Sequence, residues 1–477
     1  MKIPNYLPKS YFFTDDEMPL FEVSATFAFC NVLYKRGMSQ SLATFDLVVR
    51  DLPNNRNFML LGGTEEIIRY ILNLRFKKQH IKVLQDNGLI GKEFAAYLRK
   101  FKFSGSVSAM PEGTPFFPGE PIVRVTAPII EANLLYVCLL NILVSNTVFL
   151  TKAIRTYLVA GGKTLLTNAG RAQGMEPGSK FARAAYLAGF AASLQLSGVL
   201  KFNIPMPEKF FKSTFHAYIK AFRTELEAMM AFVEEFPNNE ATLMIDTYGL
   251  EAGLENAIKV CEKLKERGKS IHSVFVDSGD LFQGATFVRR RLDEAGFPDV
   301  KIILASSLNE WKVKELVDEG APADYFMVIT ELATCSDDPK LEVVYKMAQV
   351  DDGKTVRETM KLAPGKKSLP GKKQVYRVEE SGKFKKDIIG LEDDSVDGTK
   401  LLIPMVEKGE LIYLLPKLED IRRYVSDQVS KLPDNYRRLE VQNPAYLVEV
   451  SPKLQDLSEK IQKQHNDPTI AIQKEEI

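Results

Sequence analysis

Hydrophobic positions in the middle of the chain alternate between short continuous runs and longer stretches at helical spacing. Stretches such as 253–268 and 308–320 repeat apolar residues at the spacing of one helix face, which predicts amphipathic helices. Between these stretches lie apolar runs that predict buried strands, at Thr164–Thr167, Ala241–Gly249, Ser273–Asp280, Lys301–Ser307 and Ala323–Thr330. Strand–helix repetition requires parallel strands, because each helix must return the chain to the same edge. A barrel and an open parallel sheet both satisfy this pattern, and we favour the barrel.

The two flanking regions have different patterns. Before about residue 128, a helix is predicted at Gly63–Phe76 and short strands punctuated by prolines and glycines at Pro111–Pro128. After about residue 341 we expect strands around an Asp-Gly turn and, at Pro364–Arg377, a basic loop leading into a strand. The last 60 residues are expected to be helical and to end in a loose tail. The predicted division is 1–127, an α+β domain; 128–340, an α/β barrel; and 341–477, a C-terminal segment.

One apolar stretch, Asn133–Leu150, is about long enough to span a bilayer. Three asparagines and two serine or threonine residues interrupt it, and Glu131 and Lys152 bound it closely. A buried core helix is the better interpretation, so we expect no membrane span.

Composition narrows the function classes. The 477 residues carry a formal net charge of +1, and 45% are hydrophobic. A chain of this length is too long for a single hydrophobic core, so more than one structural unit is expected. Its near-zero net charge argues against non-specific binding to nucleic acid or membranes. Four widely spaced cysteines predict reduced, buried thiols rather than a disulfide framework or metal site. The first ten residues contain no apolar export segment, so we expect a cytoplasmic location.

Polar residues follow several of the predicted strands, at Asp246-Thr247, Val276–Asp280 and Ser306-Ser307. In parallel α/β folds the carboxyl-terminal edge formed by these strand ends is where active sites lie. Carboxylates, a hydroxyl and a glycine in Val276–Asp280 suit ribose hydroxyls or a Mg²⁺–diphosphate. The alternative, that Asp and Ser there cap the following helix, remains open.

Two further side chains are candidates for an anionic ligand. His216 follows a strand-like segment at the start of a predicted helix, with a purely structural role as the alternative, whereas His80 and His272 are expected at the surface. Arg171 also follows an apolar strand and suits a phosphate or carboxylate, with a surface salt bridge as the alternative. Walker A, GxGxxG, zinc-ligand and Ser-His-Asp patterns are absent from the sequence, and no metal-binding set is predicted.

A series of segments resembles the nicotinate phosphoribosyltransferase family in its order along the chain. These segments are PEGTPFFPGEPIVRVTAPIIEANLLYVCLLNIL at 111–143, RAQG at 171–174, ARAAYLAGF at 182–190, IDTYGLEAGLENAIKV at 245–260, VFVDSGDL at 274–281, EWKVKELVDEGAPADYF at 310–326, CSDDPKLEVVYKM at 335–347, LPGKKQVYR at 369–377 and LPDNYRRLEVQNPAYLVEVSPKL at 432–454. Each segment is weak alone, but the collinear set spans most of the chain.

The resemblance implies an irregular, TIM-like α/β barrel packed on an α+β domain formed from N-terminal and C-terminal segments. It implies a homodimer and an enzyme that joins nicotinate to phosphoribosyl diphosphate, giving nicotinate mononucleotide for NAD salvage. ATP as co-substrate acts through a phosphohistidine, and Mg²⁺ accompanies the phosphates. The expected partners are these small molecules, with no nucleic acid.

Carried over by position, the resemblance assigns His216 as the phosphorylated, catalytic histidine. The predicted substrate-binding residues are Arg171, Asp246, Asp277, Ser278, Asp280, Ser306 and Thr330. Thr330 belongs to the segment that corresponds to the family's glycine-rich phosphate loop.

Several positions depart from the family pattern. Ala25 stands where the family has a tyrosine that contacts the base. Gly170 replaces one of a pair of arginines, and Phe275 replaces another arginine. Ala192–Gln195 replaces Gly-Thr-Ser-Asn, and Met327–Glu331 replaces Gly-Val-Gly-Thr-Arg. Side chains in place of those glycines crowd a phosphate, because only glycine lets backbone N–H groups approach it closely. Two alternatives to the family reaction follow: a homologue with an altered substrate, and a catalytically silent binding or regulatory protein.

Overall fold

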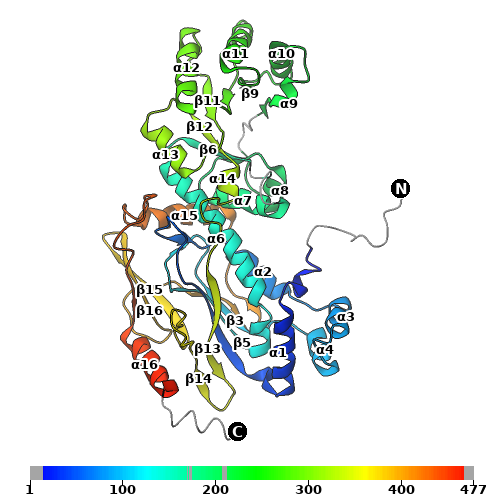
Figure 1. Cartoon of the computed structure of the whole chain (residues 1–477), viewed down its shortest axis with the longest axis vertical. Coiled ribbons are helices and arrows are strands. Elements are labelled where there is room, and N and C mark those ends of the chain that lie inside the picture. Colours follow the sequence, from blue (N-terminus) through cyan, green and yellow to red (C-terminus); the bar gives the residue numbers. More distant parts are fainter. Residues whose placement is uncertain (1–13, 169, 171–173, 207–211, 467–477) are drawn as a thin grey trace.

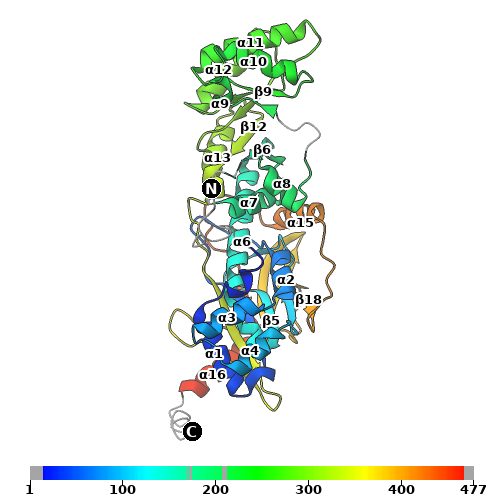
Figure 2. The same cartoon turned by 90° about the vertical axis from the view of Figure 1, so that its right-hand side faces the viewer.

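The computed structural model describes residues 14–168, 170, 174–206 and 212–466. The molecule is elongated, with an α/β half at one end of its long axis and an α+β half at the other (Figures 1 and 2). Helix α6 (Tyr136–Val159) runs between the two halves.

A seven-stranded parallel sheet forms the α/β half, in the order β7-β6-β12-β11-β10-β9-β8. Its strands are β6 (Thr164–Thr167), β7 (Ala192–Ser193), β8 (Lys212–Ser213), β9 (Ala241–Met244), β10 (Ser273–Val276), β11 (Lys301–Leu304) and β12 (Tyr325–Val328). The sheet is curled into a half-barrel with β7 and β8 at its two edges. The parallel strands predicted from the apolar runs are therefore confirmed.

Helices follow these strands, as the strand–helix alternation predicts. They are α7 (Met175–Leu187), α8 (Leu196–Phe202), α9 (His216–Ile219), α10 (Glu225–Glu235), α11 (Leu250–Lys265), α12 (Leu281–Glu294), α13 (Glu310–Asp318) and α14 (Thr330–Ala333). Alternate strand residues point to opposite faces of a sheet. Val274 and Phe326 accordingly belong to the main core, whereas Phe275 and Met327 belong to a second apolar cluster on the other face.

Strands from both ends of the chain build the α+β half, which confirms the expected mixing of N-terminal and C-terminal segments. Its antiparallel sheet has the order β14-β13-β1-β5-β3-β18-β19. The strands are β1 (Leu42–Val49), β3 (Ser106–Ala109), β5 (Pro121–Pro128), β13 (Val343–Asp351), β14 (Val356–Glu358), β18 (Ile403–Glu407) and β19 (Glu410–Leu411). Since β13 pairs with β1, the C-terminal region is part of the N-terminal core.

Smaller elements complete this half. A second sheet contains β15 (Lys373–Glu380), β16 (Lys383–Leu391), β17 (Thr399–Lys400) and β20 (Val448–Val450), and a two-stranded ladder joins β2 (Met59–Leu60) to β4 (Pro115–Phe116). The helices are η1 (Met18–Leu20), α1 (Ser24–Lys35), η2 (Met38–Gln40), α2 (Thr64–Asn73), α3 (Lys78–Asp86), α4 (Lys92–Arg99), α5 (Ile129–Asn133), α15 (Leu418–Lys431) and α16 (Pro452–Asn466). Arg422 of α15 donates hydrogen bonds to the carbonyl oxygens of Tyr186, Gly189 and Phe190, which attaches this C-terminal helix to the barrel half.

Helix α6 has the length and apolar composition of a membrane span, but 72% of its most apolar window is buried inside the protein. Its charged residues Lys152 and Arg155 are buried as well, at 1% and 3% exposure. Both form ion pairs, so α6 is the core helix that the sequence predicts.

Two sequence-based expectations are wrong. His80 is buried rather than at the surface, because its Nδ1 accepts the backbone N–H of Lys77 at 3.0 Å and closes the start of α3. The last 60 residues are not continuously helical: turns and irregular chain occupy 432–447, where Pro433 and Pro444 lack the backbone N–H that a helix needs. All four cysteines are buried free thiols, as expected.

Candidate functional site

Six of the predicted site residues follow the carboxyl-terminal ends of four adjacent parallel strands, and a seventh follows β8. His216 comes after β8, Asp246 after β9, Ser306 after β11 and Thr330 after β12. Asp277, Ser278 and Asp280 come after β10. Because the strands are parallel, all these positions lie at one edge of the half-barrel, the rim. Arg171 lies outside the described residues.

Asp246 fastens the loop after β10. Its Oδ2 accepts the backbone N–H of Asp277 at 2.8 Å and the hydroxyl of Ser278 at 2.7 Å. Its Oδ1 is buried and has no hydrogen-bond partner among the described residues. A buried carboxylate oxygen without a donor is costly, so this atom marks a place where a ligand donor or a cation fits.

His216 lies at the neighbouring strand end and is half-buried. Its Nδ1 is 3.1 Å from the hydroxyl oxygen of Thr247, the residue after Asp246. This contact fixes the imidazole ring and leaves Nε2 as the nitrogen that can face a ligand. Phe215 and Tyr248 flank the pair with side chains that are 45% and 65% exposed.

Asp280 is the N-cap of α12, which is the alternative that the sequence left open. Its Oδ1 accepts the backbone N–H groups of Phe282 and Gln283 at 3.0 and 3.1 Å. Its Oδ2 makes no hydrogen bond within the described chain. Capping therefore uses one oxygen of Asp280, and a ligand can still use the other.

An open pocket of about 940 Å³ lies between the ends of β10 and β11, the first turn of α12 and one side of α13 as far as Glu319. Asp280, Ser306, Ser307 and Lys312 are among its lining residues. Ser306 and Ser307 have φ angles of 87° and 48°, a left-handed backbone that costs energy in residues with a side chain. Strained backbone beside a pocket is typical of functional loops.

The face of the sheet opposite the helices is apolar. Phe275 is 2% exposed and Met327 4% exposed, and Ile329 packs against the same cluster. Its other buried members are Leu166, Ala192, Met244, Ile303 and Ala305. Thus the two side chains that replace the family's loop glycines, Met327 and Ile329, belong to an apolar floor beneath the rim.

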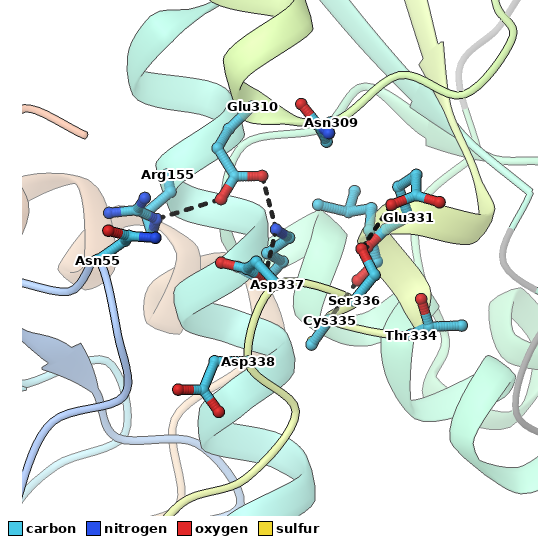
Figure 3. Close-up of polar contacts among 12 residues, drawn as sticks. Asn55, Arg155, Asn309, Glu310, Glu331, Thr334, Cys335, Ser336, Asp337 and Asp338 are labelled. Carbon is cyan, nitrogen blue, oxygen red and sulfur yellow. Dashed lines mark hydrogen bonds and ion pairs between the residues drawn. The ribbon is translucent and has the colours of Figure 1, made fainter. Parts of the chain in front are cut away.

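Thr330 and Glu331 begin the single-turn helix α14, and Thr330 is exposed. The carboxylate of Glu331 accepts the hydroxyl of Ser336 at 2.5 Å, and Figure 3 shows the two side chains directed toward one another. No cation lies within salt-bridge distance of Glu331 in the described ranges. Within the part of the chain that the structure describes, the negative charge of Glu331 therefore stands beside Thr330 without an ion-pair partner.

The sequence placed Thr247 and Ser307 after predicted strands but gave them no role, and it missed Asn309 and Lys312. In the structure Thr247 contacts His216, and Ser307, Asn309 and Lys312 line the pocket. Asn309 caps α13 by accepting the backbone N–H groups of Trp311 and Lys312, a role that an asparagine before a helical stretch indicates. Ala25, in contrast, lies on α1 in the α+β half (Figure 1).

A parallel α/β half-barrel with carboxylates, hydroxyls and an oriented imidazole at its carboxyl-terminal rim defines a barrel-type enzyme. Models of the N-terminal and C-terminal domains of nicotinate phosphoribosyltransferase match residues 25–144 and 395–458. The chain is 34% identical over 415 residues to a nicotinate phosphoribosyltransferase of Mycobacterium tuberculosis, covering 86% of this chain and 87% of the relative. It is 33% identical over 459 residues to that of Bacillus subtilis, covering 90% and 92%. The chain belongs to the nicotinate phosphoribosyltransferase family.

Solved structures agree with this fold. Human nicotinic acid phosphoribosyltransferase superimposes with a TM-score of 0.81 at 22% identity, over 92% of this chain and 99% of that one. A protein from Pyrococcus furiosus described as a nicotinate-nucleotide pyrophosphorylase gives a TM-score of 0.70 at 22% identity, over 89% and 99%. The half-barrel packed on an α+β domain is thus a fold shared with these proteins.

Proposed function

We propose that this chain joins nicotinate to phosphoribosyl diphosphate, giving nicotinate mononucleotide and diphosphate for NAD salvage. One observation carries the proposal: in a chain of this family, His216 and the loop fastened by Asp246 meet at the same rim. The loop brings the carboxylates that the sugar needs, and the histidine brings a phosphoryl acceptor.

The chemistry sets what the rim must supply. Breaking the anomeric C–O bond develops positive charge on the ribose, much as in glycoside cleavage. We propose that the carboxylate of Asp277 and the second carboxylate oxygen of Asp280 hold ribose hydroxyls and stabilise that charge. Ser278, Ser306 and Thr330 add hydroxyl groups for the phosphates, and Arg171 a guanidinium.

Mg²⁺ fits the donor set at the rim. Mg²⁺ prefers oxygen ligands and is usually held by one or two carboxylates together with substrate phosphates. Oδ1 of Asp246, which is buried and has no hydrogen-bond partner among the described residues, is such an oxygen, and the backbone of Asp277 is bonded to the other oxygen of the same carboxylate. Bound there, the cation would neutralise charge on the departing diphosphate.

His216 is the residue through which we propose that ATP hydrolysis is coupled to the reaction. The contact of Nδ1 with Thr247 orients the ring so that Nε2 accepts a phosphoryl group. A phosphohistidine beside the rim places negative charge near the Mg²⁺–diphosphate site. Formation and hydrolysis of the phosphohistidine can therefore alter the affinity for phosphoribosyl diphosphate and for the product diphosphate.

We further propose a cytoplasmic homodimer. Large apolar side chains are exposed together around α1 and the start of α6: Val23 (49%), Phe29 (42%) and Tyr136 (39%), with Ala25 between them in the chain. These residues line one shallow pocket, a surface of the kind that an interface covers. The four buried free thiols suit a reducing compartment.

The apolar floor favours a second candidate, a phosphoribosyltransferase-fold protein acting on a less anionic ligand. Phe275, Met327 and Ile329 supply dispersion contacts to a ring but no positive charge to a phosphate. Such a ligand would place its ring on the floor and its hydroxyls on the rim carboxylates.

Purified protein with nicotinate, phosphoribosyl diphosphate, ATP and Mg²⁺ separates the two candidates. The proposed function requires nicotinate mononucleotide as product and a rise in Tm with phosphoribosyl diphosphate. No product and no rise in Tm would exclude it. A rise in Tm with nucleosides but not with phosphoribosyl diphosphate would favour the second candidate.

A further inference from the structure

A buried lysine connects two segments of the rim. Lys152 of α6 is 1% exposed, and its Nζ lies 2.6 Å from Oε2 of Glu310 and 2.7 Å from Oδ1 of Asp337. The ammonium group donates a hydrogen bond to Asp337, and its contact with Oε2 of Glu310 is an ion pair, so one cation contacts two carboxylates at once. Figure 3 shows Glu310 and Asp337 converging on this point from two different parts of the chain.

Each carboxylate anchors a segment that carries a proposed substrate residue. Glu310 is fully buried and is the first residue of α13, only three residues after the strained Ser306-Ser307 pair. Asp337 follows Ser336, whose hydroxyl contacts Glu331 next to Thr330. Through Glu310 and Asp337, the segment after β11 and the segment after β12 therefore contact the same ammonium group, that of Lys152.

The neighbouring arginines show what Lys152 adds. Arg155 Nε lies 3.4 Å from Oε1 of Glu310, and Arg56 Nη1 lies 2.7 Å from Oδ2 of Asp337. Each carboxylate thus has an arginine of its own, and neutralisation does not require the lysine. Among the described residues, Lys152 is the cation that pairs with both carboxylates.

We propose that Lys152 is a positioning residue that holds the segments after β11 and β12 in one arrangement, so that Ser306 and Thr330 face the same phosphorylated substrate. The substrate part of this statement rests on the proposed function. The mechanical part, that the two segments are coupled through Lys152, does not.

Lys152→Met tests the coupling with little risk of leaving a bare buried charge. Removing one partner of a buried ion pair usually destabilises a protein because it leaves the other charge uncompensated. In this variant Glu310 keeps Arg155 and Asp337 keeps Arg56, so two neutral pairs remain. Lys152→Gln, which retains a hydrogen-bond donor of similar length without the charge, is the second variant if Lys152→Met does not fold.

Lys180→Met is the matched control. Lys180 is also a buried lysine between two carboxylates, 2.7 Å from Glu66 and 3.4 Å from Glu176, but it contacts neither rim segment. A general loss of packing or charge would affect both variants alike.

The first measurement is amide hydrogen exchange in the full chain over 305–310 and 329–338, which needs no turnover. We expect faster exchange in both segments for Lys152→Met and unchanged exchange there for Lys180→Met. Unchanged exchange, or faster exchange in one segment alone, would overturn the coupling.

The second measurement is steady-state kinetics with phosphoribosyl diphosphate. We expect KM to rise about tenfold with a small change in kcat, because displacing a binding group by an ångström can cost up to about 10²-fold. An unchanged KM together with faster exchange would overturn the positioning role. If the wild-type chain forms no nicotinate mononucleotide, the proposed function fails, and the exchange measurement still decides the coupling.

Discussion

Asp246 and Ser278 join the ends of two adjacent strands through a 2.7 Å hydrogen bond from the serine hydroxyl to Oδ2. The same oxygen accepts the backbone N–H of Asp277. Asp246 therefore fixes the loop that presents Asp277, while Oδ1 of Asp246 has no hydrogen-bond partner among the described residues. One carboxylate both positions a neighbour and offers a ligand atom.

Asp246→Asn should lower kcat/KM by about 10²-fold, because the single amide oxygen can either accept from the loop or face the proposed Mg²⁺ site, so one of the two roles is lost. Stability should fall by only about 1–2 kcal/mol, the cost of weakened hydrogen bonds. Asp324→Asn is the control, since Asp324 accepts the backbone N–H of Ile302 at 2.9 Å at the opposite edge of the sheet. Equal loss of activity in both variants would contradict the role of Asp246.

His216→Gln should abolish the dependence of nicotinate mononucleotide formation on ATP while leaving a slower, uncoupled reaction. Glutamine keeps a polar group near Thr247 but cannot carry a phosphoryl group. The measurement is ADP released per product formed, together with retention of label from γ-labelled ATP. His272→Gln is the control, because His272 precedes β10 at the far edge of the sheet. Retained coupling in His216→Gln would refute the assignment.

The sequence predicts the strands of the half-barrel well because their apolar runs and flanking helices are local patterns. The rim residues follow from those strands, since polar residues after a parallel strand must lie at the same edge. Contacts such as His216–Thr247 are harder to predict from the sequence, because the two residues are 31 positions apart and meet only after β8 and β9 pair.

The ion network around Lys152 carries no local signal at all. Its members come from α6, α13, the segment after α14 and the loop at Arg56. In the sequence, a lysine within an apolar helix indicates only a break in the hydrophobic pattern. The surroundings of Glu331 could be predicted from the sequence only in part. Its charge is evident in the sequence, but its contact with Ser336 depends on the single turn of α14.

Glu331→Arg should strengthen binding of phosphoribosyl diphosphate. The exchange replaces a negative charge beside Thr330, which has no ion-pair partner among the described residues, with a cation, and a charge-assisted hydrogen bond contributes about 1.5–3 kcal/mol. We expect KM for phosphoribosyl diphosphate to fall about tenfold or more, measured at constant ionic strength. Glu319→Arg, an exposed position at the edge of the pocket, makes the same change in net charge and should have a smaller effect. Equal effects would indicate long-range attraction instead of a local contact.

Buried ionisable groups in the α+β half predict a pH dependence of stability. Glu120 is fully buried, and burial, followed by the neighbouring Asp387 carboxylate, raises its pKa well above the ordinary 4.5. Asp387 is held by Arg377 and also accepts the hydroxyl of Tyr446 at 3.2 Å. Above pH 4.5 the folded chain keeps a proton on Glu120 that the unfolded chain releases. The contribution of Glu120 to stability is therefore complete below that pH and is lost as pH rises toward its folded-state pKa.

Glu120→Gln should remove this loss, because the amide imitates the protonated carboxyl group and does not titrate. We expect the free energy of unfolding of the variant, relative to the wild type, to increase between pH 5 and pH 8 by up to about 1.4 kcal/mol per pH unit. Urea unfolding at several pH values measures it, with the exposed Glu407→Gln as control. Parallel pH profiles for the wild type and Glu120→Gln would show that Glu120 is ionised in the folded chain, with Arg377 neutralising both carboxylates.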